Sequence, residues 1–459
     1  MNSLSIFGTS SDAGKSTVSF ALTYLLHQRG ISVAPFKAQN VSNNSHVTDE
    51  GGEIAIPQHF AAEAIGLKTT PYMNPVLLKS GGASKAHMII NGKSRANKDV
   101  LEYYRDIDSL KPIVKEAFLK LKDSYDVIVA EGAGSPVELN LMDKDLSNIY
   151  IADEFNTKII LVADIERGGV FASIYGVYNL LPKKLRDNVI GVIINKFRGD
   201  MSLFEQGRVI IEKEFGIKVL GVVPYKPFNL GFEDAQSITG YIQDIKEAKI
   251  KAGVIKLPHI SNFTDFEPIV ADSEVELSFV SNPKELSTCD VIILPGSKRV
   301  VDDLIWLREN GFEKTLKSKK RMIIAICGGY EMMHEYILDP HKIESKQKKA
   351  YGFGRIKGDV VFEKEKIVKK GCYRLFGEMI DGYEIHNGVA KKRVVTKKNL
   401  YATFVHGIFE SDEFRYKLFS EINPAYKGYN FKEYKTKAIK EFAHHIELHV
   451  DIDEIQKAL

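Results

Sequence analysis

The chain has 459 residues, of which 44% are hydrophobic and 27% are charged, and these proportions exclude a disordered or fibrous protein. Its 63 Lys and Arg residues nearly balance its 60 Asp and Glu residues, which leaves a formal net charge of +3. This near-balance predicts neither a nucleic-acid partner nor binding to an anionic membrane surface.

We expect neither a membrane-spanning segment nor a secretion signal in this protein. No apolar run approaches the ~18 residues that a transmembrane helix needs, and the opening MNSLSIFGTS has no basic region followed by a long apolar stretch. The three cysteines, Cys289, Cys327 and Cys372, lie far apart. Such a sparse, odd set argues against a disulfide framework. We therefore expect a cytoplasmic protein in which any functional cysteine acts as a thiol.

The first half of the chain alternates short apolar runs with helical patterns. The runs lie at residues 5–7, 127–130, 159–164, 189–195 and 219–223. Each is continuously apolar, as in strands that are buried on both faces of a parallel sheet. Residues 17–30 have helical spacing and end at Gly30, and the run at 31–36 follows them. The pattern predicts a βαβ unit and an α/β domain.

A second α/β series follows a polar stretch with turn signals. Its apolar runs lie at residues 252–257, 276–280, 290–296, 322–327 and 402–407. We expect two α/β domains, each built on a parallel sheet. The predicted divisions are a phosphate-loop domain at 1–235, a linker at 236–250, a second domain at 251–445 and a C-terminal tail at 446–459.

Residues 8–17, GTSSDAGKST, follow the first apolar run and open the first helical pattern. The segment fits the end of a phosphate-binding loop, in which backbone N–H groups at a helix N-terminus cradle phosphates. Lys15 is expected to contact the terminal phosphates, and the Ser16 hydroxyl to bind Mg²⁺. A chance glycine turn is the alternative, and the strand–loop–helix context disfavours it. The predicted nucleotide-binding residues in this loop are Thr9, Asp12, Gly14, Lys15, Ser16 and Thr17.

Further polar residues stand where buried strands should end. Glu131 directly follows one apolar run, and Asp49 lies in a polar loop. Ligands of open α/β sheets bind at the carboxyl ends of the strands, and Mg²⁺ prefers hard oxygen ligands. We therefore predict a metal site formed by Ser16, Asp49 and Glu131, with a helix cap or solvated loop acids as the alternative. Asn195 ends another run and is expected to read the adenine edge, unless it only forms a turn.

Residues 324–333, IAICGGYEMM, place Cys327 between an apolar run and a helical pattern. This layout is typical of a nucleophile elbow, which exposes the side chain on a strained strand-to-helix turn. His406 ends a later run and is a candidate base. Backbone N–H groups at Gly296 and Gly328 are expected to form an oxyanion hole. A buried structural cysteine and a core histidine are the alternative, which the combination of the two disfavours.

These segments together resemble the cobyric acid synthase family of glutamine-dependent amidotransferases. The longest matching motifs are ADIERGGVFASIYG (163–176), LPHISNFTDFEP (257–268) and EGAGSPVELNL (131–141). Shorter motifs extend the resemblance over most of the chain: FKAQNVSNNS (36–45), GGEI (51–54), MNPVLLK (73–79), INKFRGD (194–200), LPGSK (294–298), GYEIHNG (382–388) and VHGIFE (405–410).

The resemblance implies two coupled reactions. The N-terminal domain would be similar to dethiobiotin synthetase and would use ATP and Mg²⁺ to phosphorylate a substrate carboxylate. The C-terminal domain would be a class I glutamine amidotransferase, in which Cys327 and His406 release ammonia from glutamine. The implied corrinoid substrate is adenosylcobyrinic acid a,c-diamide, amidated at its b, d, e and g side chains. Lys37 would contact the substrate carboxylate or the transferred phosphoryl group, unless it is a surface lysine.

One departure from the class I pattern concerns the residue that orients His406. These enzymes usually carry His-x-Glu, but Ile408 occupies the glutamate position here. Glu410 is a candidate orienter, and a backbone carbonyl or water is the alternative. Two rival functions remain: amidation of the a and c side chains by a sister enzyme, or a ParA-like nucleotide switch that carries an inactive amidotransferase domain.

Overall fold

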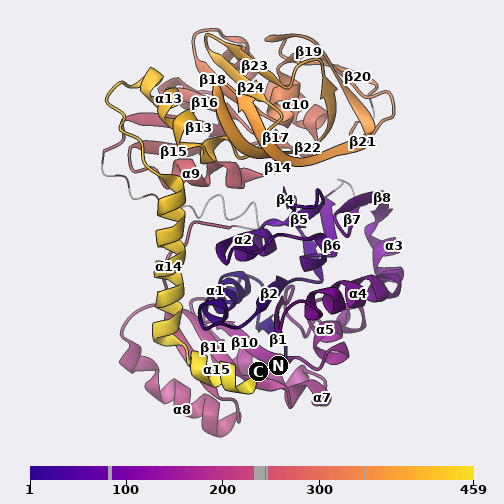
Figure 1. The fold of residues 1–459 in the computed structure, drawn as a ribbon, viewed down its shortest axis with the longest axis vertical. Helices are drawn as coiled ribbons and strands as arrows, with labels where there is room; N and C mark the ends of the chain where they lie inside the picture. The colour runs from indigo at the N-terminus through magenta and orange to yellow at the C-terminus, as the bar shows by residue number, and fades with distance from the viewer. Residues whose placement is uncertain (81–84, 232–242, 244, 246, 346) are drawn as a thin grey trace. The chain divides into compact units, whose positions relative to one another are not determined.

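The computed structural model describes residues 1–80, 85–231, 243, 245, 247–345 and 347–459. Contacts among these residues divide them into two units. Figure 1 colours the ribbon by residue number, so the segments of each unit can be followed there. Unit 1 comprises Met1–Ser42, Glu53–Phe228 and Thr436–Leu459, and unit 2 comprises Asn43–Gly52 and Asn229–Lys435. The predicted linker at 236–250 lies outside the described residues, except at 243, 245 and 247–250.

The main sheet of unit 1 has six parallel strands in the order β12-β11-β10-β1-β9-β2. Nearly all of their residues are buried, because helices cover both faces. The predicted α/β class is confirmed. The strands are β1 (Leu4–Gly8), β2 (Val33–Phe36), β9 (Val127–Glu131), β10 (Lys158–Asp164), β11 (Val189–Phe197) and β12 (Val219–Pro224).

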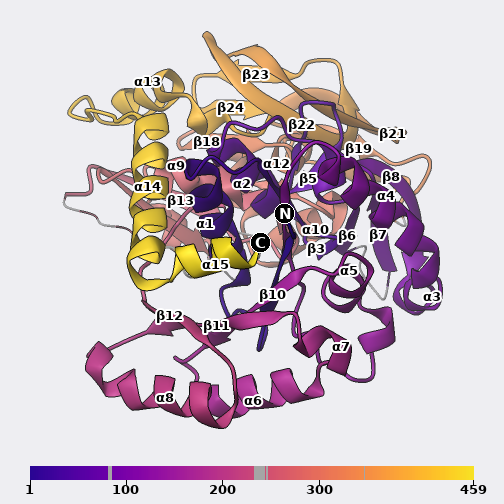
Figure 2. The same ribbon diagram turned by 60° about the horizontal axis from the view of Figure 1, so that its bottom comes forward.

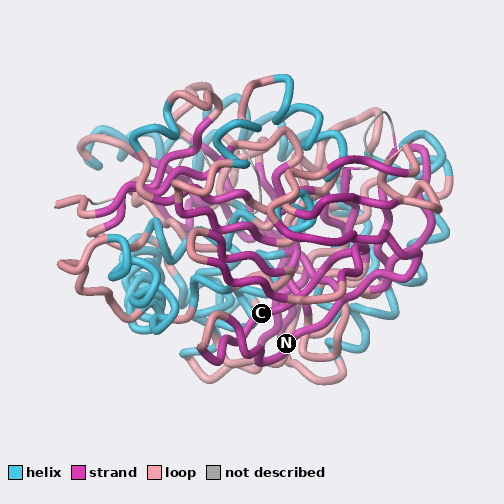
Figure 3. The backbone as a smooth tube through the Cα atoms, turned by 90° about the horizontal axis from the view of Figure 1, so that it is seen from above, coloured by secondary structure: helices cyan, strands magenta, loops and turns pink. Residues whose placement is uncertain are grey.

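Helices lie next to the strands, as the colouring by secondary structure in Figure 3 shows. Figure 2 shows α6 next to α8, and Phe171 and Tyr175 of α6 contact Phe204 and Phe215, the residues that flank α8. In unit 1, the helices that precede its C-terminal segment are α1 (Lys15–Gln28), α2 (Ile56–Ala64), α3 (Val100–Arg105), α4 (Lys111–Lys122), α5 (Ile149–Glu154), α6 (Val170–Leu180), α7 (Lys183–Arg186) and α8 (Glu205–Glu214).

A smaller sheet in unit 1 was not expected from the sequence. Its strand order is β3-β6-β7-β8, with β3 and β6 parallel and the other pairs antiparallel. Its strands are β3 (Gln39–Val41), β6 (Val76–Ser80), β7 (Lys85–Ile90) and β8 (Lys93–Asp99); the short strands β4 (Ser45–Val47) and β5 (Glu53–Ala55) lie between β3 and β6 in the sequence.

The main sheet of unit 2 has the order β15-β13-β16-β18-β24-β23 and is parallel except at its β24–β23 edge. A second sheet, β20-β19-β21-β22, contains a long antiparallel hairpin. The strands are β13 (Ile250–Ile255), β14 (Ile260–Ser261), β15 (Val275–Val280), β16 (Val291–Leu294), β17 (Gly296–Ser297), β18 (Met322–Ile326), β19 (His334–Leu338), β20 (Lys349–Tyr351), β21 (Ile356–Leu375), β22 (Glu378–Ala390), β23 (Val394–Lys397) and β24 (Leu400–Thr403).

The helices of unit 2 are short, and its hydrophobic core gathers around β13, β16 and β18. They are α9 (Glu267–Val270), α10 (Val300–Glu309), α11 (Glu313–Lys317), α12 (Gly328–Met332) and α13 (Asp412–Ile422). No helix in the described part of the chain combines the length and apolar character that crossing a membrane requires.

The segment expected as a C-terminal tail is helical and packs on unit 1. It contains the last four residues of α14 (Phe431–His449) and all of α15 (Ile452–Ala458). Just before this segment, on α14, the ring of Phe442 stacks on that of Phe228 with 4.5 Å between centroids, and within the segment Asp451 N–H donates to Leu220 O at 2.8 Å. By their contacts, residues 436–459 therefore belong with the first domain, whereas residues 43–52 belong with the second.

The packing of α15 predicts a measurable contribution to stability. Ile455 is fully buried, so Ile455→Ala is expected to lower the free energy of unfolding by about 2–4 kcal/mol through lost burial and a residual cavity. Leu448 is 65% exposed and serves as the matched control, with an expected change within about 0.5 kcal/mol. Urea unfolding followed by circular dichroism measures both. Equal effects of the two substitutions would contradict the docking of α15.

Candidate active sites

The phosphate loop of unit 1 connects β1 to α1 in the arrangement expected from the sequence. Gly14 caps α1 with φ 94°, a left-handed conformation that favours glycine. A Cβ at Gly14 would lie 2.1 Å from Asn195 Nδ2, so the loop also needs glycine here for space. Lys15 Nζ donates to Ser10 O at 3.2 Å, and Thr17 Oγ1 donates to Gly14 O at 3.0 Å. The lysine ammonium is thus held over the loop.

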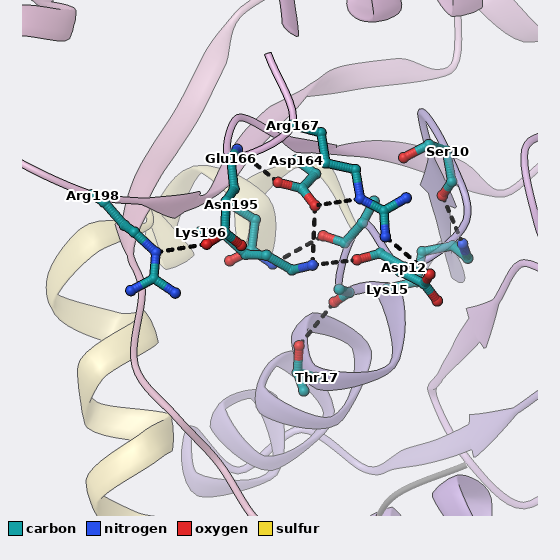
Figure 4. A network of polar contacts seen from close by, with 12 residues as sticks. Ser10, Asp12, Lys15, Thr17, Asp164, Glu166, Arg167, Asn195, Lys196 and Arg198 are labelled. Atoms are coloured by element: carbon teal, nitrogen blue, oxygen red, sulfur yellow. Dashed lines mark hydrogen bonds and ion pairs between the residues drawn. The ribbon is translucent and has the colours of Figure 1, made fainter. Parts of the chain in front are cut away.

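Residues at the ends of β10 and β11 hold the loop from a second side, as Figure 4 shows. Asn195 Nδ2 donates to Ala13 O at 3.0 Å. Lys196 Nζ donates to Asp12 O at 2.6 Å and to Asp164 Oδ2 at 3.0 Å. Arg167 forms an ion pair with Asp12 at 3.2 Å. The loop conformation is therefore fixed by polar contacts from neighbouring strand ends.

The remaining loop residue of the predicted set is Thr9. It is buried, and its N–H donates to Val162 O on β10 at 2.9 Å. This bond continues the β1–β10 ladder beyond the end of β1. The structure therefore brings all six predicted loop residues, together with Asn195, to one end of the unit 1 sheet.

A buried polar cluster surrounds Glu131 at the end of β9. Its Oε1 accepts from Ser16 Oγ at 2.7 Å and from Lys37 Nζ at 2.8 Å. Its Oε2 accepts from Gln58 Nε2 at 3.1 Å. Because only 3% of Glu131 is exposed, these three donors offset the cost of burying its charge. Lys37 is therefore a buried residue beside the loop and not a surface lysine.

The chemistry of this cluster fits Mg²⁺. Ser16 Oγ and Glu131 Oε1 are hard oxygen donors in contact with each other. Within the described ranges, no group of three or more His, Cys, Asp and Glu side chains is arranged to hold a metal ion. A cation bound here would thus take further ligands from phosphate and water, as Mg²⁺ commonly does.

Asp49, the third predicted metal ligand, lies in residues 43–52 and thus in unit 2. Its Oδ1 accepts a hydrogen bond from Lys370 Nζ at 2.8 Å. The contact links the 43–52 segment to β21. A role for Asp49 beside Glu131 stays a prediction.

The predicted nucleophile of unit 2 lies on a strained turn. Cys327 follows β18 directly and has φ 50° and ψ −111°, which a residue with a side chain adopts at a cost. Its N–H donates to Thr403 O at 2.8 Å, which fixes the turn against β24. Its Sγ lies 3.7 Å from Ile385 O on β22. Strain of this kind, held by the surrounding backbone, is typical of a nucleophile elbow.

His406 is buried and pairs with a carboxylate that sequence reasoning missed. Its Nδ1 lies 2.7 Å from Asp265 Oδ2, and Asp265 Oδ1 accepts from Gly407 N–H at 2.8 Å. Burial by itself lowers the pKa of His406, but the Asp265 carboxylate and then Cys327 outweigh it and raise that pKa to about 10. The proton that leaves the thiol therefore has a stable place on His406.

Asp265, and not Glu410, occupies the orienting position. The predictions that Glu410 or a backbone carbonyl orients His406 were wrong. The partner of His406 Nδ1 is the carboxylate of Asp265, which lies 141 residues away in the sequence. Glu410 is exposed. In the sequence, Asp265 is marked only by its place in the motif ISNFTDF.

The Asp265 contact predicts a large effect on glutamine hydrolysis. Asp265→Asn removes the charge that stabilises the protonated ring, so we expect the rate to fall by about 10³ or more. Glu410→Gln is expected to keep nearly the wild-type rate. Asp272→Asn is a matched control, since Asp272 is another buried carboxylate of unit 2, bonded to Tyr426 Oη at 2.6 Å. A glutamate-release assay measures all three, and a slow Glu410→Gln enzyme would contradict the assignment.

The two predicted oxyanion glycines lie close to Cys327 and His406. A Cβ at Gly296 would lie 3.2 Å from Cε1 of His406, and a Cβ at Gly328 would lie 2.7 Å from Ser297 N. Gly328 thus needs glycine for close packing, and a side chain at Gly296 would be tight. Gly328 is the first residue of α12, so its N–H is at a helix N-terminus beside Cys327.

Similarity to known proteins agrees with both sites. Residues 4–229 match the family described as the CobQ/CobB/MinD/ParA nucleotide binding domain. Residues 251–414 match the CobB/CobQ-like glutamine amidotransferase domain. The fold and the two sites thus define a glutamine amidotransferase joined to a nucleotide-binding domain.

Full-length relatives narrow this class. The chain is 54% identical over 445 residues to the cobyric acid synthase of Acinetobacter baylyi, covering 96% of each chain. It is 38% identical over 453 residues to that of Clostridium botulinum, covering 92% of this chain and 91% of the relative. For Clostridium tetani the identity is 36% over 484 residues, covering 99% and 98%. The chain belongs to the cobyric acid synthase family, and its expected class of enzyme is confirmed.

Proposed function

We propose that this chain uses ATP and glutamine to amidate the b, d, e and g carboxylates of adenosylcobyrinic acid a,c-diamide. The observation that supports the proposal is that one chain of this family carries two clusters of candidate catalytic and binding residues, one in each unit. Unit 2 holds Cys327 with His406 and Asp265. Unit 1 holds a phosphate loop in which Ser16 donates to Glu131 Oε1. The same carboxylate oxygen accepts a hydrogen bond from Lys37.

Glutamine hydrolysis begins at Cys327. Its thiol proton passes to His406, and Sγ attacks the side-chain amide carbon of glutamine. Backbone N–H groups near Gly328 stabilise the oxygen that becomes negative. The C–N bond then breaks, His406 returns the proton to the leaving nitrogen, and ammonia departs. Water hydrolyses the remaining thioester to glutamate and restores the thiol.

The synthetase reaction consumes that ammonia. A carboxylate oxygen of the corrinoid attacks the γ-phosphorus of ATP, and the bond to the β-phosphate oxygen breaks, which gives ADP and an acyl phosphate. Ammonia attacks the acyl carbon, and inorganic phosphate leaves with the former carboxylate oxygen. Lys15 and Lys37 supply positive charge near the transferred group. Bound Mg²⁺ would neutralise phosphate charge, held by Ser16 and Glu131.

Two assignments at the sites remain proposals. We assign Asn195 to the adenine edge, although its Nδ2 donates to Ala13 O, because its place at the end of β11 supports a nucleotide contact. We assign Asp49 as a further acidic ligand on sequence grounds alone. The cytoplasmic location also rests on the sequence, through its three scattered cysteines.

Counting the amides added to defined corrinoids tests the proposed substrate. The purified chain is incubated with ATP, Mg²⁺ and glutamine and either the a,c-diamide or the corresponding corrinoid acid that lacks those two amides. We expect addition of up to four amides to the a,c-diamide, measured by mass spectrometry. Amidation of the corrinoid acid at only two positions, with the a,c-diamide left unchanged, would instead support the sister reaction at a and c.

A further inference from the structure

A second carboxylate in unit 2, Asp303 on α10, has no part in the chemistry described above. It is fully buried, with each oxygen taken by a different side chain. Its Oδ2 accepts from Ser297 Oγ at 2.6 Å, and its Oδ1 lies 2.7 Å from Nδ1 of His259. A buried charge is costly unless it is hydrogen-bonded in this way, so the arrangement is expected to be rigid.

The two partners of Asp303 come from opposite sides of a short antiparallel ribbon. Ser297 belongs to β17, and His259 immediately precedes β14, which pairs with β17. A backbone hydrogen bond joins the same two strands next to these side chains, since Lys298 N–H donates to His259 O at 2.9 Å. The Ser297 hydroxyl is held by a second hydrogen bond. It accepts from Arg299 N–H at 3.0 Å while it donates to Asp303.

The direction of the Ser297 N–H follows from the ladder. In an antiparallel pair, successive N–H groups point alternately toward and away from the partner strand. Lys298 N–H points toward the partner, at His259 O, so the N–H of Ser297 points away from it. On that side a Cβ at Gly328 would lie 2.7 Å from Ser297 N. The Ser297 N–H therefore faces the backbone that follows the nucleophile.

We propose that Asp303 is a positioning residue for glutamine hydrolysis, which holds Ser297 so that its backbone N–H donates to the oxyanion formed at Cys327. The inference rests on the proposed glutaminase activity. It also refines the expected oxyanion hole, since Ser297 N–H replaces Gly296 N–H as the donor from this strand. Asp303 touches no reacting atom; it acts through the conformation of β17.

The test compares three variants in the full chain. Asp303→Ala removes both contacts, so kcat for glutamine hydrolysis is expected to fall by about 10², the usual effect of losing one oxyanion donor, with little change in KM. Asp303→Asn keeps an oxygen that accepts from Ser297, and its amide can donate to the other tautomer of His259, so most of the rate should return. Ser297→Ala removes only the hydroxyl and is expected to cost about tenfold.

Two readouts distinguish positioning from general damage. Alkylation of Cys327 by iodoacetamide forms no oxyanion, so its rate should be unchanged in every variant. Binding of glutamate γ-semialdehyde, whose thiol adduct carries an oxygen in the oxyanion position, should weaken in parallel with kcat. Asp272→Ala is the control for loss of a buried carboxylate elsewhere in unit 2, and it should leave both readouts unchanged.

Several outcomes would overturn the inference. A folded Asp303→Ala enzyme with the wild-type kcat would do so, as would a fall in alkylation equal to the fall in hydrolysis. If Asp303→Ala does not fold, Ser297→Ala decides, and an unchanged rate there rejects the proposal. Wild-type chain that releases no glutamate from glutamine would instead reject the proposed function itself.

Discussion

A Cys327→Ser variant is expected to lose amidation with glutamine and to keep amidation with ammonium salts. A serine hydroxyl gives up its proton far less readily than a thiol, so glutamate release should fall by at least about 10³. Cys327 belongs to unit 2 and the phosphate loop to unit 1, and free ammonia bypasses the hydrolysis step. The measurement is corrinoid amide formation with each nitrogen source, together with glutamate release.

Cys372→Ser is the matched control, because Cys372 is an exposed free thiol on β21 and should be silent in both assays. Loss of both activities in a Cys327→Ser protein that retains its wild-type melting temperature would contradict the division of the two chemistries between the units. Retention of glutamine-dependent amidation would remove Cys327 from the nucleophile position.

The second large effect is expected at the Glu131 cluster. Glu131→Gln replaces the charge on which Ser16, Lys37 and Gln58 converge, and it places an amide where two donors now meet one oxygen. Lys15→Ala removes the ammonium over the phosphate loop. Both variants should lose amidation from glutamine and from ammonia alike, by about 10²–10³ or more, since preorganised charge is lost. Glutamate release measured without the corrinoid should persist.

Glu138→Gln is the control for the Glu131 variant, because Glu138 is an exposed acid in the loop after β9. A magnesium titration adds a separate test. An amidation rate of the Glu131→Gln enzyme that depends on Mg²⁺ as in the wild type would remove Glu131 from the metal site, even if the overall rate were low.

The strands that are buried on both faces could be predicted from the sequence, because only apolar residues fit there. The runs at 159–164 and 322–327 appear as β10 and β18 within one residue at each end, because strands covered on both faces must be continuously apolar. The β21–β22 hairpin was missed for the opposite reason. Much of β21 is exposed and rich in lysine and glutamate, so its sequence has the composition of a solvated loop.

The sites divide in the same way. Lys15, Cys327 and His406 were found because each stands immediately after or near the end of an apolar strand, which is a local signal. Asp265 and Gln58 were not found, because each acts only by a contact with a residue far away in the sequence, His406 and Glu131 respectively. Asp265 lies on a single 3₁₀ turn, which has no periodicity to mark it.

The order of the chain imposes an order on folding. Unit 1 takes its last segment, residues 436–459, from the very end of the chain, so synthesis delivers Phe442 and Ile455 only after all of unit 2 has left the ribosome. Until then Phe228 can stack on Phe20 but lacks the ring of Phe442, and a nascent unit 1 exposes apolar surface for as long as translation of about two hundred residues takes. A fragment cut at residue 229 would remain in that unfinished state permanently, whatever the integrity of its phosphate loop.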